Sequence, residues 1–317
     1  SLPVPALTPF QKRVGLTRRA LAARGMYETV TWAFTDSRWA KLFTDLKPGL
    51  FLANPISSDL DVMRPNALIN LIAAVGRNQS RGFADLSLFE VGPEFFGDQP
   101  GDQRLVAAGL RAGATAPRSW TGSRRDVDLF DAKADAEALL EALGTAAANV
   151  QVNVDGAPQW YHPGRSAALQ LGPKNVLGYF GELHPKVLKA LGVKGRVMAF
   201  ELFIENVPSP KKKGTGRPAL NASSFQSVER DFAFLLDADV KSDAIVKAAR
   251  SVDRNLITDV TIFDLYAGKG IEDGKKSIAF SITLQPTKAT LTEEEIDAVS
   301  KKVVAAVEKA TGGSLRA

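Results

Sequence analysis

The chain has 317 residues and a formal net charge of +5, with 45% hydrophobic and 24% charged residues. This composition suggests a globular protein of two domains and excludes a collagen, a coiled coil and a fully disordered chain. The absence of cysteine excludes a disulfide framework and every cysteine-ligated metal centre, and it favours a reducing, cytoplasmic location. No apolar run approaches the ~18 residues of a membrane helix, so we expect neither a membrane span nor a membrane partner.

The chain begins without an initiator Met or the apolar core of a signal peptide, so we expect a piece of a longer protein. The first predicted element is a helix, with Thr8 as N-cap, a proline in its first turn and Gly25 as its glycine stop. It carries apolar residues at three positions: Phe10, Val14 and Leu21. Next, Val30, Trp32 and Phe34 alternate with smaller residues, which predicts a half-buried strand.

The rest of the N-terminal part mixes several strands with few helices. Helices are predicted over residues 68–75 and 131–143, and strands over 86–91, 105–110, 167–171, 176–180 and 197–204. Because strands and helices do not alternate strictly, we expect an α+β fold with a largely antiparallel sheet in residues 1–208. Residues 209–224 are rich in proline, glycine, serine and lysine and predict a linker.

Residues 225–317 predict a second domain with the order βαββαβ. The strands are expected over 228–236, 260–266, 277–285 and 314–316, with one helix over 242–252. The other helix starts at a capping box of Thr292 and Glu295 and stops at Gly312. This order is the ferredoxin-like split unit. The domain has 13 basic and 15 acidic residues, so the basic excess lies in the part before it.

The sequence offers few candidates for catalysis. The glycines and lysines of 268–277 do not have P-loop spacing, and a hairpin loop is the better interpretation. His162 and His184 stand beside turn residues rather than on a shared face, which disfavours a metal or general-base role. Four carboxylates near strands have no evident partners and are interpreted as edge or surface charges: Glu90, Glu94, Glu201 and Glu205.

One strand of the second domain offers a surface for RNA. Its residues Ile278, Phe280, Ile282 and Leu284 should face the helices, leaving Ser277, Ser281, Thr283 and Gln285 on an open face that could accept unstacked bases. Side chains for phosphate contact or stacking are Arg230, Tyr266, Lys275 and Lys276. The alternative is that these are only solvated strand residues, as the slight acidity of this domain would favour.

The second domain contains five motifs in order: 225–234 (FQSVERDFAF), 261–266 (TIFDLY), 274–279 (GKKSIA), 290–296 (TLTEEEI) and 314–316 (SLR). With these motifs it resembles the ferredoxin-fold anticodon-binding domain of bacterial phenylalanine–tRNA ligase beta subunits. Residues 25–30 (GMYETV), 54–58 (NPISS), 63–64 (MR), 88–92 (LFEVG) and 181–185 (GELHP) are similar to the catalytic-like module of the same subunit. The resemblance covers nearly the whole chain and implies a C-terminal fragment of such a subunit.

The resemblance implies a class II synthetase-like antiparallel sheet module that does not catalyse, followed by the anticodon-binding domain. ATP, magnesium and phenylalanine would be held by the alpha subunit, with no cofactor or metal in this chain. Residues 93–97 lack the arginine that a working class II site would place there. Editing would lie in domains outside this chain.

The expected partners are the alpha subunit, a second alpha/beta heterodimer and the tRNA for phenylalanine. The first helix, with Phe10, Val14 and Leu21, would help to form the subunit interface. The expected RNA contacts are Arg230, Tyr266, Lys275, Lys276 and Ser277. Two alternatives stay open, an ATP-dependent enzyme in its own right and an interaction module that reads no RNA.

Overall fold

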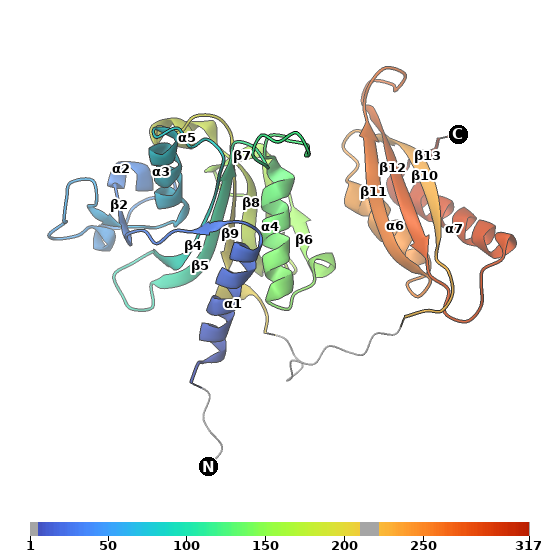
Figure 1. Cartoon of the computed structure of the whole chain (residues 1–317), viewed down its shortest axis with the longest axis horizontal. Helices are drawn as coiled ribbons and strands as arrows, with labels where there is room; N and C mark the ends of the chain where they lie inside the picture. Colours follow the sequence, from blue (N-terminus) through green and yellow to red (C-terminus); the bar gives the residue numbers. More distant parts are fainter. Residues whose placement is uncertain (1–5, 210–221, 317) are drawn as a thin grey trace, which may run out of the picture. The chain divides into compact units, whose positions relative to one another are not determined.

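The computed structural model describes residues 6–209 and 222–316, which fall into two compact units, Ser1–Gly214 and Thr215–Ala317 (Figure 1). The boundary between the units lies inside the predicted linker, residues 209–224. Most of that linker, 210–221, lies outside the described residues, so its character stays a prediction.

Unit 1 is built on a seven-stranded sheet that is antiparallel except for one parallel pair at its edge. In sheet order the strands are β1 (Tyr27–Glu28), β4 (Leu86–Phe95), β5 (Gln103–Ala112), β9 (Val197–Phe203), β8 (Val176–Leu183), β7 (Tyr161–Gln170) and β6 (Gln151–Asn153). The parallel pair is β1 with β4. This confirms the predicted α+β fold with a largely antiparallel sheet.

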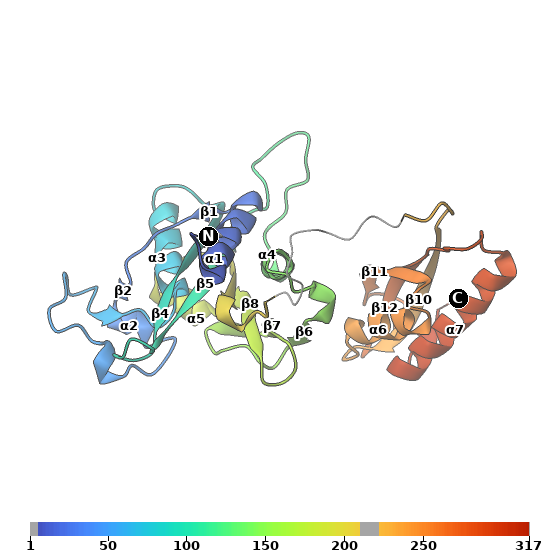
Figure 2. The same ribbon diagram turned by 90° about the horizontal axis from the view of Figure 1, so that it is seen from below.

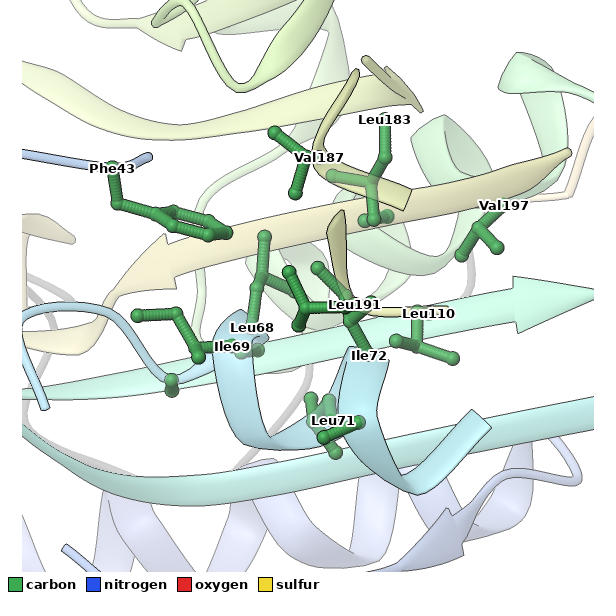
Figure 3. Close-up of a cluster of buried hydrophobic side chains, with 14 of the residues drawn as sticks. Phe43, Leu68, Ile69, Leu71, Ile72, Leu110, Leu183, Val187, Leu191 and Val197 are labelled. Atoms are coloured by element: carbon green, nitrogen blue, oxygen red, sulfur yellow. The ribbon is translucent and has the colours of Figure 1, made fainter. Parts of the chain in front are cut away.

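Helices cover both faces of this sheet, so unit 1 has two apolar layers. Helix α3 (Leu68–Gln79) packs on one face together with α5 (Pro185–Ala190). Figure 3 shows its side chains Leu68, Ile69, Leu71 and Ile72 beside Leu110 of β5. The other face is covered by α1 (Pro9–Ala23) and α4 (Leu129–Ala142), whose Leu139 and Leu140 pack with Phe89 and Phe200.

The ends of α1 and α4 follow the expected capping chemistry. The Thr8 side chain accepts from the backbone N–H of Gln11, and the Gln11 side chain accepts from the Thr8 N–H in return. Gly25 after α1 and Gly144 after α4 have φ of 76° and 93°, in the left-handed region that glycine adopts without strain.

The predicted strand through Val30, Trp32 and Phe34 is wrong for most of its length. Only β1 (Tyr27–Glu28) and β2 (Phe34–Thr35) are regular, and β2 pairs with β3 (Val62–Met63). Val30 is 89% exposed and Trp32 is 62% exposed. The alternation of apolar residues therefore marks an exposed extended segment rather than a half-buried strand.

The remaining elements of unit 1 are short. They are α2 (Ser37–Ala40) and three single 3₁₀ turns, η1 (Pro48–Leu50), η2 (Ala147–Asn149) and η3 (Ile204–Asn206). Such pieces carry too few residues for a periodic apolar pattern, so the sequence does not indicate them.

Unit 2 has the predicted βαββαβ order. Its elements are β10 (Val228–Asp237), α6 (Ser242–Val252), β11 (Ile257–Tyr266), β12 (Lys275–Leu284), α7 (Glu293–Thr311) and β13 (Ser314–Leu315). The strands form an antiparallel sheet of order β11-β12-β10-β13, and both helices cover one face (Figure 1). Ile278, Phe280, Ile282 and Leu284 are fully buried against the helices, as predicted.

Candidate functional site

Unit 1 carries a buried polar cluster on the sheet face that α3 covers. Glu94, Arg104 and Glu201 come from the neighbouring strands β4, β5 and β9 and point to this face. Both carboxylates are fully buried. Three adjacent strands thus place two carboxyl groups and a guanidinium on one face of the sheet.

Every oxygen of Glu94 and Glu201 is occupied by a protein donor. Arg104 donates to Glu94 Oε2 from Nη2 at 3.0 Å and from Nε at 3.1 Å, and the backbone N–H of Ala67 donates to Oε1 at 3.0 Å. Glu201 Oε2 accepts from Trp160 Nε1 and Tyr161 OH, both at 2.9 Å. Its Oε1 accepts from Asn66 Nδ2.

The two carboxyl groups also influence one another. Burial and, to a smaller extent, the nearby Glu94 carboxylate together raise the pKa of Glu201 to about 7, against the three hydrogen bonds that favour the charged form. Burial likewise raises the pKa of Glu94, although Arg104 opposes the shift. The Arg104 guanidinium lies 3.7 Å from the centre of the Phe203 ring, so its charge is held between a carboxylate and an aromatic face.

A second buried pair lies next to this cluster. Arg64 Nη1 donates to Glu90 Oε1 at 2.9 Å, and Arg64 Nε donates to the Pro93 carbonyl at 2.9 Å. A Cβ atom at Gly92 would lie 2.3 Å from Arg64 Nη2, so a larger residue there would displace this guanidinium. Arg64 is therefore a structural cation that is bound within the protein.

These contacts correct the interpretation of Glu90, Glu94 and Glu201 as edge or surface charges, whereas Glu205 is exposed as expected. Their partners come from other strands and loops, and the sequence does not show which residues those are. Within the described residues, Arg104 and Arg64 of this cluster are each paired with a carboxylate, and each oxygen of Glu94 and Glu201 accepts at least one hydrogen bond from the protein.

His162 and His184 do share a surface, contrary to expectation, because β7 and β8 are neighbours. Their ring centroids are 6.4 Å apart. Each Nδ1 accepts a backbone N–H two residues on, that of Gly164 or Lys186, at 3.1 Å. Within residues 6–209 and 222–316 no group of three or more metal-ligating side chains is found, and no helix there is long and apolar enough to span a membrane.

In unit 2 the open face of the sheet has one basic and aromatic end. Tyr266 of β11 pairs with Ser277 of β12, and it is 42% exposed. Lys275 lies at the start of β12 and forms an ion pair with Glu272 at 3.0 Å. Arg316 follows β13, and its Nη1 lies 3.4 Å from Ser277 Oγ. Tyr266, Lys275 and Arg316 are named the β11–β13 end below.

Ser277 is buried, which contradicts its predicted exposure, because Arg316 lies over its hydroxyl. Ser281, Thr283 and Gln285 are half-buried rather than exposed. Sequence reasoning misses Arg316 as a contact residue. The pairing of β13 with β10 brings it there, and a two-residue strand leaves almost no signal in the sequence.

Arg230 and Lys276 do not belong to the open face. Arg230 lies on the same face of β10 as the buried Phe232, which is the face that the helices cover. Its Nη2 forms an ion pair with Glu293 of α7 at 3.2 Å. Lys276 Nζ donates to the carbonyls of Ala238 and Val240 at 2.8 and 2.6 Å. The structure therefore brings together Tyr266, Lys275 and Ser277 from the predicted set and separates the other two.

The predicted subunit-interface residues of α1 differ in exposure. Leu21 is fully buried inside unit 1, so its assignment to an exposed interface is wrong: the helix turns this position toward Phe89 and α4. Val14 is half-buried and Phe10 is exposed. Sequence reasoning also misses the large exposed apolar side chains just beyond α1, which are Tyr27, Val30 and Trp32.

Comparison with known proteins assigns both units. Residues 223–316 match the family described as the ferredoxin-fold anticodon binding domain. Residues 2–204 match the family described as the phenylalanyl tRNA synthetase beta chain CLM domain. The two matches in tandem define a protein of the aminoacyl-tRNA synthetase class.

The similar relatives are called phenylalanine–tRNA ligase beta subunits. The relative from Paramagnetospirillum magneticum is 56% identical over 317 residues, which is all of this chain and 40% of the relative. The one from Rhodospirillum rubrum is 55% identical over 99% of this chain and 39% of its own length. The chain belongs to the phenylalanyl-tRNA synthetase beta chain family, and it spans about two fifths of these relatives.

A solved pyrrolysyl-tRNA synthetase from Desulfitobacterium hafniense aligns with 64% of this chain and 68% of its own. Its TM-score is 0.45 and its identity 16%, values too low to carry an inference about the fold.

Proposed function

We propose that the chain is a non-catalytic part of a phenylalanine–tRNA ligase, which assembles with the alpha subunit through unit 1 and contacts the tRNA for phenylalanine through unit 2. The observation that carries this proposal is the 56% identity to a beta subunit along the whole chain. The alpha subunit would hold ATP, magnesium and phenylalanine, in a cytoplasmic complex of two alpha/beta heterodimers.

The buried polar cluster supports a role without catalysis. A catalytic unit of the class II synthetase type would hold the nucleotide phosphates with cations on the strands of its sheet. In this chain Glu94 and Glu201 are fully buried on the sheet face under α3 and bound to Arg104, Trp160 and Tyr161. A site for ATP needs free cations on the strands, and Arg104 is already engaged by a carboxylate.

The exposed apolar residues of unit 1 support assembly with a partner. Phe10, Tyr27, Val30 and Trp32 lie on α1 and on the extended segment that follows it. Large exposed apolar side chains are enriched at interfaces between subunits. The proposed occupant is the alpha subunit.

The β11–β13 end supports contact with RNA. Tyr266 offers a ring for stacking, and Lys275 and Arg316 offer charge for phosphate oxygens. We expect Arg316→Gln to weaken binding of fluorescently labelled phenylalanine tRNA about fivefold and to lower its salt dependence by the equivalent of about one phosphate. Arg230→Gln is the matched control, because Arg230 lies on the helix side of the sheet.

Fluorescence anisotropy over a salt series would measure both effects. Unchanged affinity for Arg316→Gln would favour the alternative of an interaction module that reads no RNA. Pyrophosphate exchange by the chain without an alpha subunit would instead favour the ATP-dependent enzyme. Light scattering of the chain mixed with purified alpha subunit tests the assembly, and absence of a complex would contradict it.

A further inference from the structure

A basic hairpin with a fully exposed tryptophan projects from unit 1. The segment between β5 and α4 closes through a bridge between Ala114 and Asp126 and a hydrogen bond from Thr115 N–H to the Arg125 carbonyl at 2.9 Å. Its tip carries Trp120, which is 96% exposed. Figure 2 shows this hairpin as a green loop that stands away from the body beside α4. No function proposed above accounts for an indole held in this position.

Three chain segments meet at the end of the sheet from which this hairpin leaves. The register pairs Leu86 at the start of β4 with Ala112 at the end of β5, and Ala112 with Val197 at the start of β9. It also pairs Glu182, near the end of β8, with Met198. The residues before β4, after β5 and between β8 and β9 therefore lie at one end of the sheet.

All charged residues of these three segments are basic. Residues 76–84, 115–125 and 185–196 together contain nine basic residues and no acidic residue. Arg124, Arg125 and Arg196 form ion pairs with carboxylates that lie outside the segments. The other six make no ion pair within the described residues, and they are Arg77, Arg81, Arg118, Lys186, Lys189 and Lys194.

Hydrogen bonds join the segments into one surface. The Asp85 carboxylate accepts from the Ala114 N–H at 2.8 Å and from Arg124 at 3.1 Å, which ties the end of the 76–84 segment to the hairpin. Gln79 Nε2 donates to the Lys194 carbonyl at 2.9 Å, and the Lys194 N–H donates to Gln79 Oε1 at 3.0 Å. Exposed Phe83 adds a second aromatic ring close to Arg81 in the chain.

We propose that this surface of unit 1, formed by the three segments and named the basic end, is a second RNA-binding site that acts on a single-stranded part of the tRNA. Trp120 stacks on an unpaired base, while Arg118, Lys189 and Lys194 contact backbone phosphates. The inference rests on the proposed function, because it requires that the complex binds tRNA at all.

The chemistry of the basic end favours RNA over an acidic protein. An exposed indole between arginines, on a loop rich in small polar residues, is suited to stacking on any base without a shaped pocket. The cations are spread over three segments rather than gathered around an apolar centre, which suits the repeating charge of a phosphate backbone. A protein interface would instead have few charges at its core.

The test measures the affinity of the chain for labelled phenylalanine tRNA by fluorescence anisotropy at several salt concentrations. We expect Trp120→Ala to weaken binding about tenfold and Trp120→Phe to retain most of the affinity. The matched control is Phe96→Ala, because Phe96 is an exposed aromatic residue at the opposite end of β4. All these positions are exposed, and circular dichroism verifies that each variant is folded.

The cations are tested by the double variant Arg118→Gln with Lys194→Gln. Log affinity falls as log salt rises, and we expect this decrease to be less steep in the variant. The magnitude of the slope should be smaller by ~0.7–0.9 for each phosphate that is no longer neutralised. The control is Lys41→Gln with Lys174→Gln, which removes the same charge away from the basic end and should leave the slope close to that of the unaltered chain.

The outcomes separate this inference from the proposed function. If the unaltered chain fails to bind tRNA, both are overturned. If Arg316→Gln weakens binding while Trp120→Ala does not, the basic end is not an RNA site, and the proposed function stands. If Trp120→Ala weakens association with the alpha subunit but not with tRNA, the surface binds protein, and the inference is overturned.

Discussion

At the scale of single residues, Glu201 is a buried group whose ionisation makes the stability of unit 1 depend on pH. It lies fully buried at the centre of the sheet, and its pKa of about 7 is well above the ordinary value of 4.5. Between these two pH values the folded state binds more protons at this site than the unfolded state does. The stability that protonated Glu201 provides is therefore present at low pH and declines as the pH rises toward 7.

We expect Glu201→Gln to remove this pH dependence. The amide keeps one oxygen that can accept from Trp160 and Tyr161, and it has no proton to lose. The free energy of unfolding of this variant, measured by urea titration from about pH 5 to about pH 8, should vary less with pH than that of the unaltered chain. The two slopes should differ by at most ~1.4 kcal/mol per pH unit. Glu205→Gln, at an exposed position, should reproduce the original dependence. Identical pH profiles for Glu201→Gln and the unaltered chain would contradict this assignment.

At the scale of elements, the start of α7 shows how capping fixes a helix in place. The Thr292 side chain accepts from the Glu295 N–H at 3.3 Å, and Glu295 Oε2 accepts from the Thr292 N–H at 2.9 Å. At its other end the helix stops at Gly312, which has a φ of 68°. Both boundaries follow from residues that are evident in the sequence.

Removing the cap oxygen should destabilise unit 2. We expect Thr292→Ala to lower its free energy of unfolding by about 1 kcal/mol, because the first-turn N–H groups lose an acceptor. Thr292→Ser retains the oxygen and should cost much less. Urea unfolding followed by far-ultraviolet circular dichroism measures both changes, and equal losses in the two variants would exclude capping as the cause.

Sequence alone predicts elements whose signals are local. Helix α7 and the alternating β12 carry such signals, and both lie close to their predicted bounds. The extended segment around Val30 and Trp32 has the same alternation as a strand, and only the tertiary fold determines that its apolar side chains face outward. Local pattern does not distinguish an apolar side chain that is buried from one that is exposed.

The candidate sites could be predicted less well than the elements, because each depends on strand pairing. Arg230 lies on the helix side of its sheet and Ser277 lies beneath Arg316, and both facts follow from the register of β10. The partners of Glu94 and Glu201 are also brought in from separate strands and loops. A buried carboxylate and a surface carboxylate therefore have the same appearance in a sequence until those neighbours are known.

At the scale of the whole molecule, each unit has its own apolar core. The core of unit 2 contains Phe234, Phe280 and Ile282, and all residues of this cluster lie in unit 2. The two apolar layers of unit 1 draw only on residues of unit 1. A domain with its own core can unfold as a separate cooperative unit.

We expect two calorimetric transitions that mutations shift independently. Ile282→Ala should destabilise unit 2 by about 2–5 kcal/mol, since it leaves a cavity in a fully buried position, and so lower one transition by many degrees. Leu71→Ala should lower the other transition in the same way. Differential scanning calorimetry of both variants distinguishes this from a single cooperative unit, in which either substitution would shift the whole unfolding profile.

The irregular register of β11 has a consequence for how the molecule behaves at high concentration. This strand forms one edge of the unit 2 sheet, and its pairing with β12 shifts twice, between Ile257 and Asp259 and between Ile262 and Asp264. Each shift inserts a residue that bends and twists the strand, so its outward N–H and C=O groups do not form a straight row. A straight row would be a template on which a strand of another molecule could add, and the two bulges thus protect an exposed edge, which carries Phe263 and Leu265, against intermolecular sheet growth.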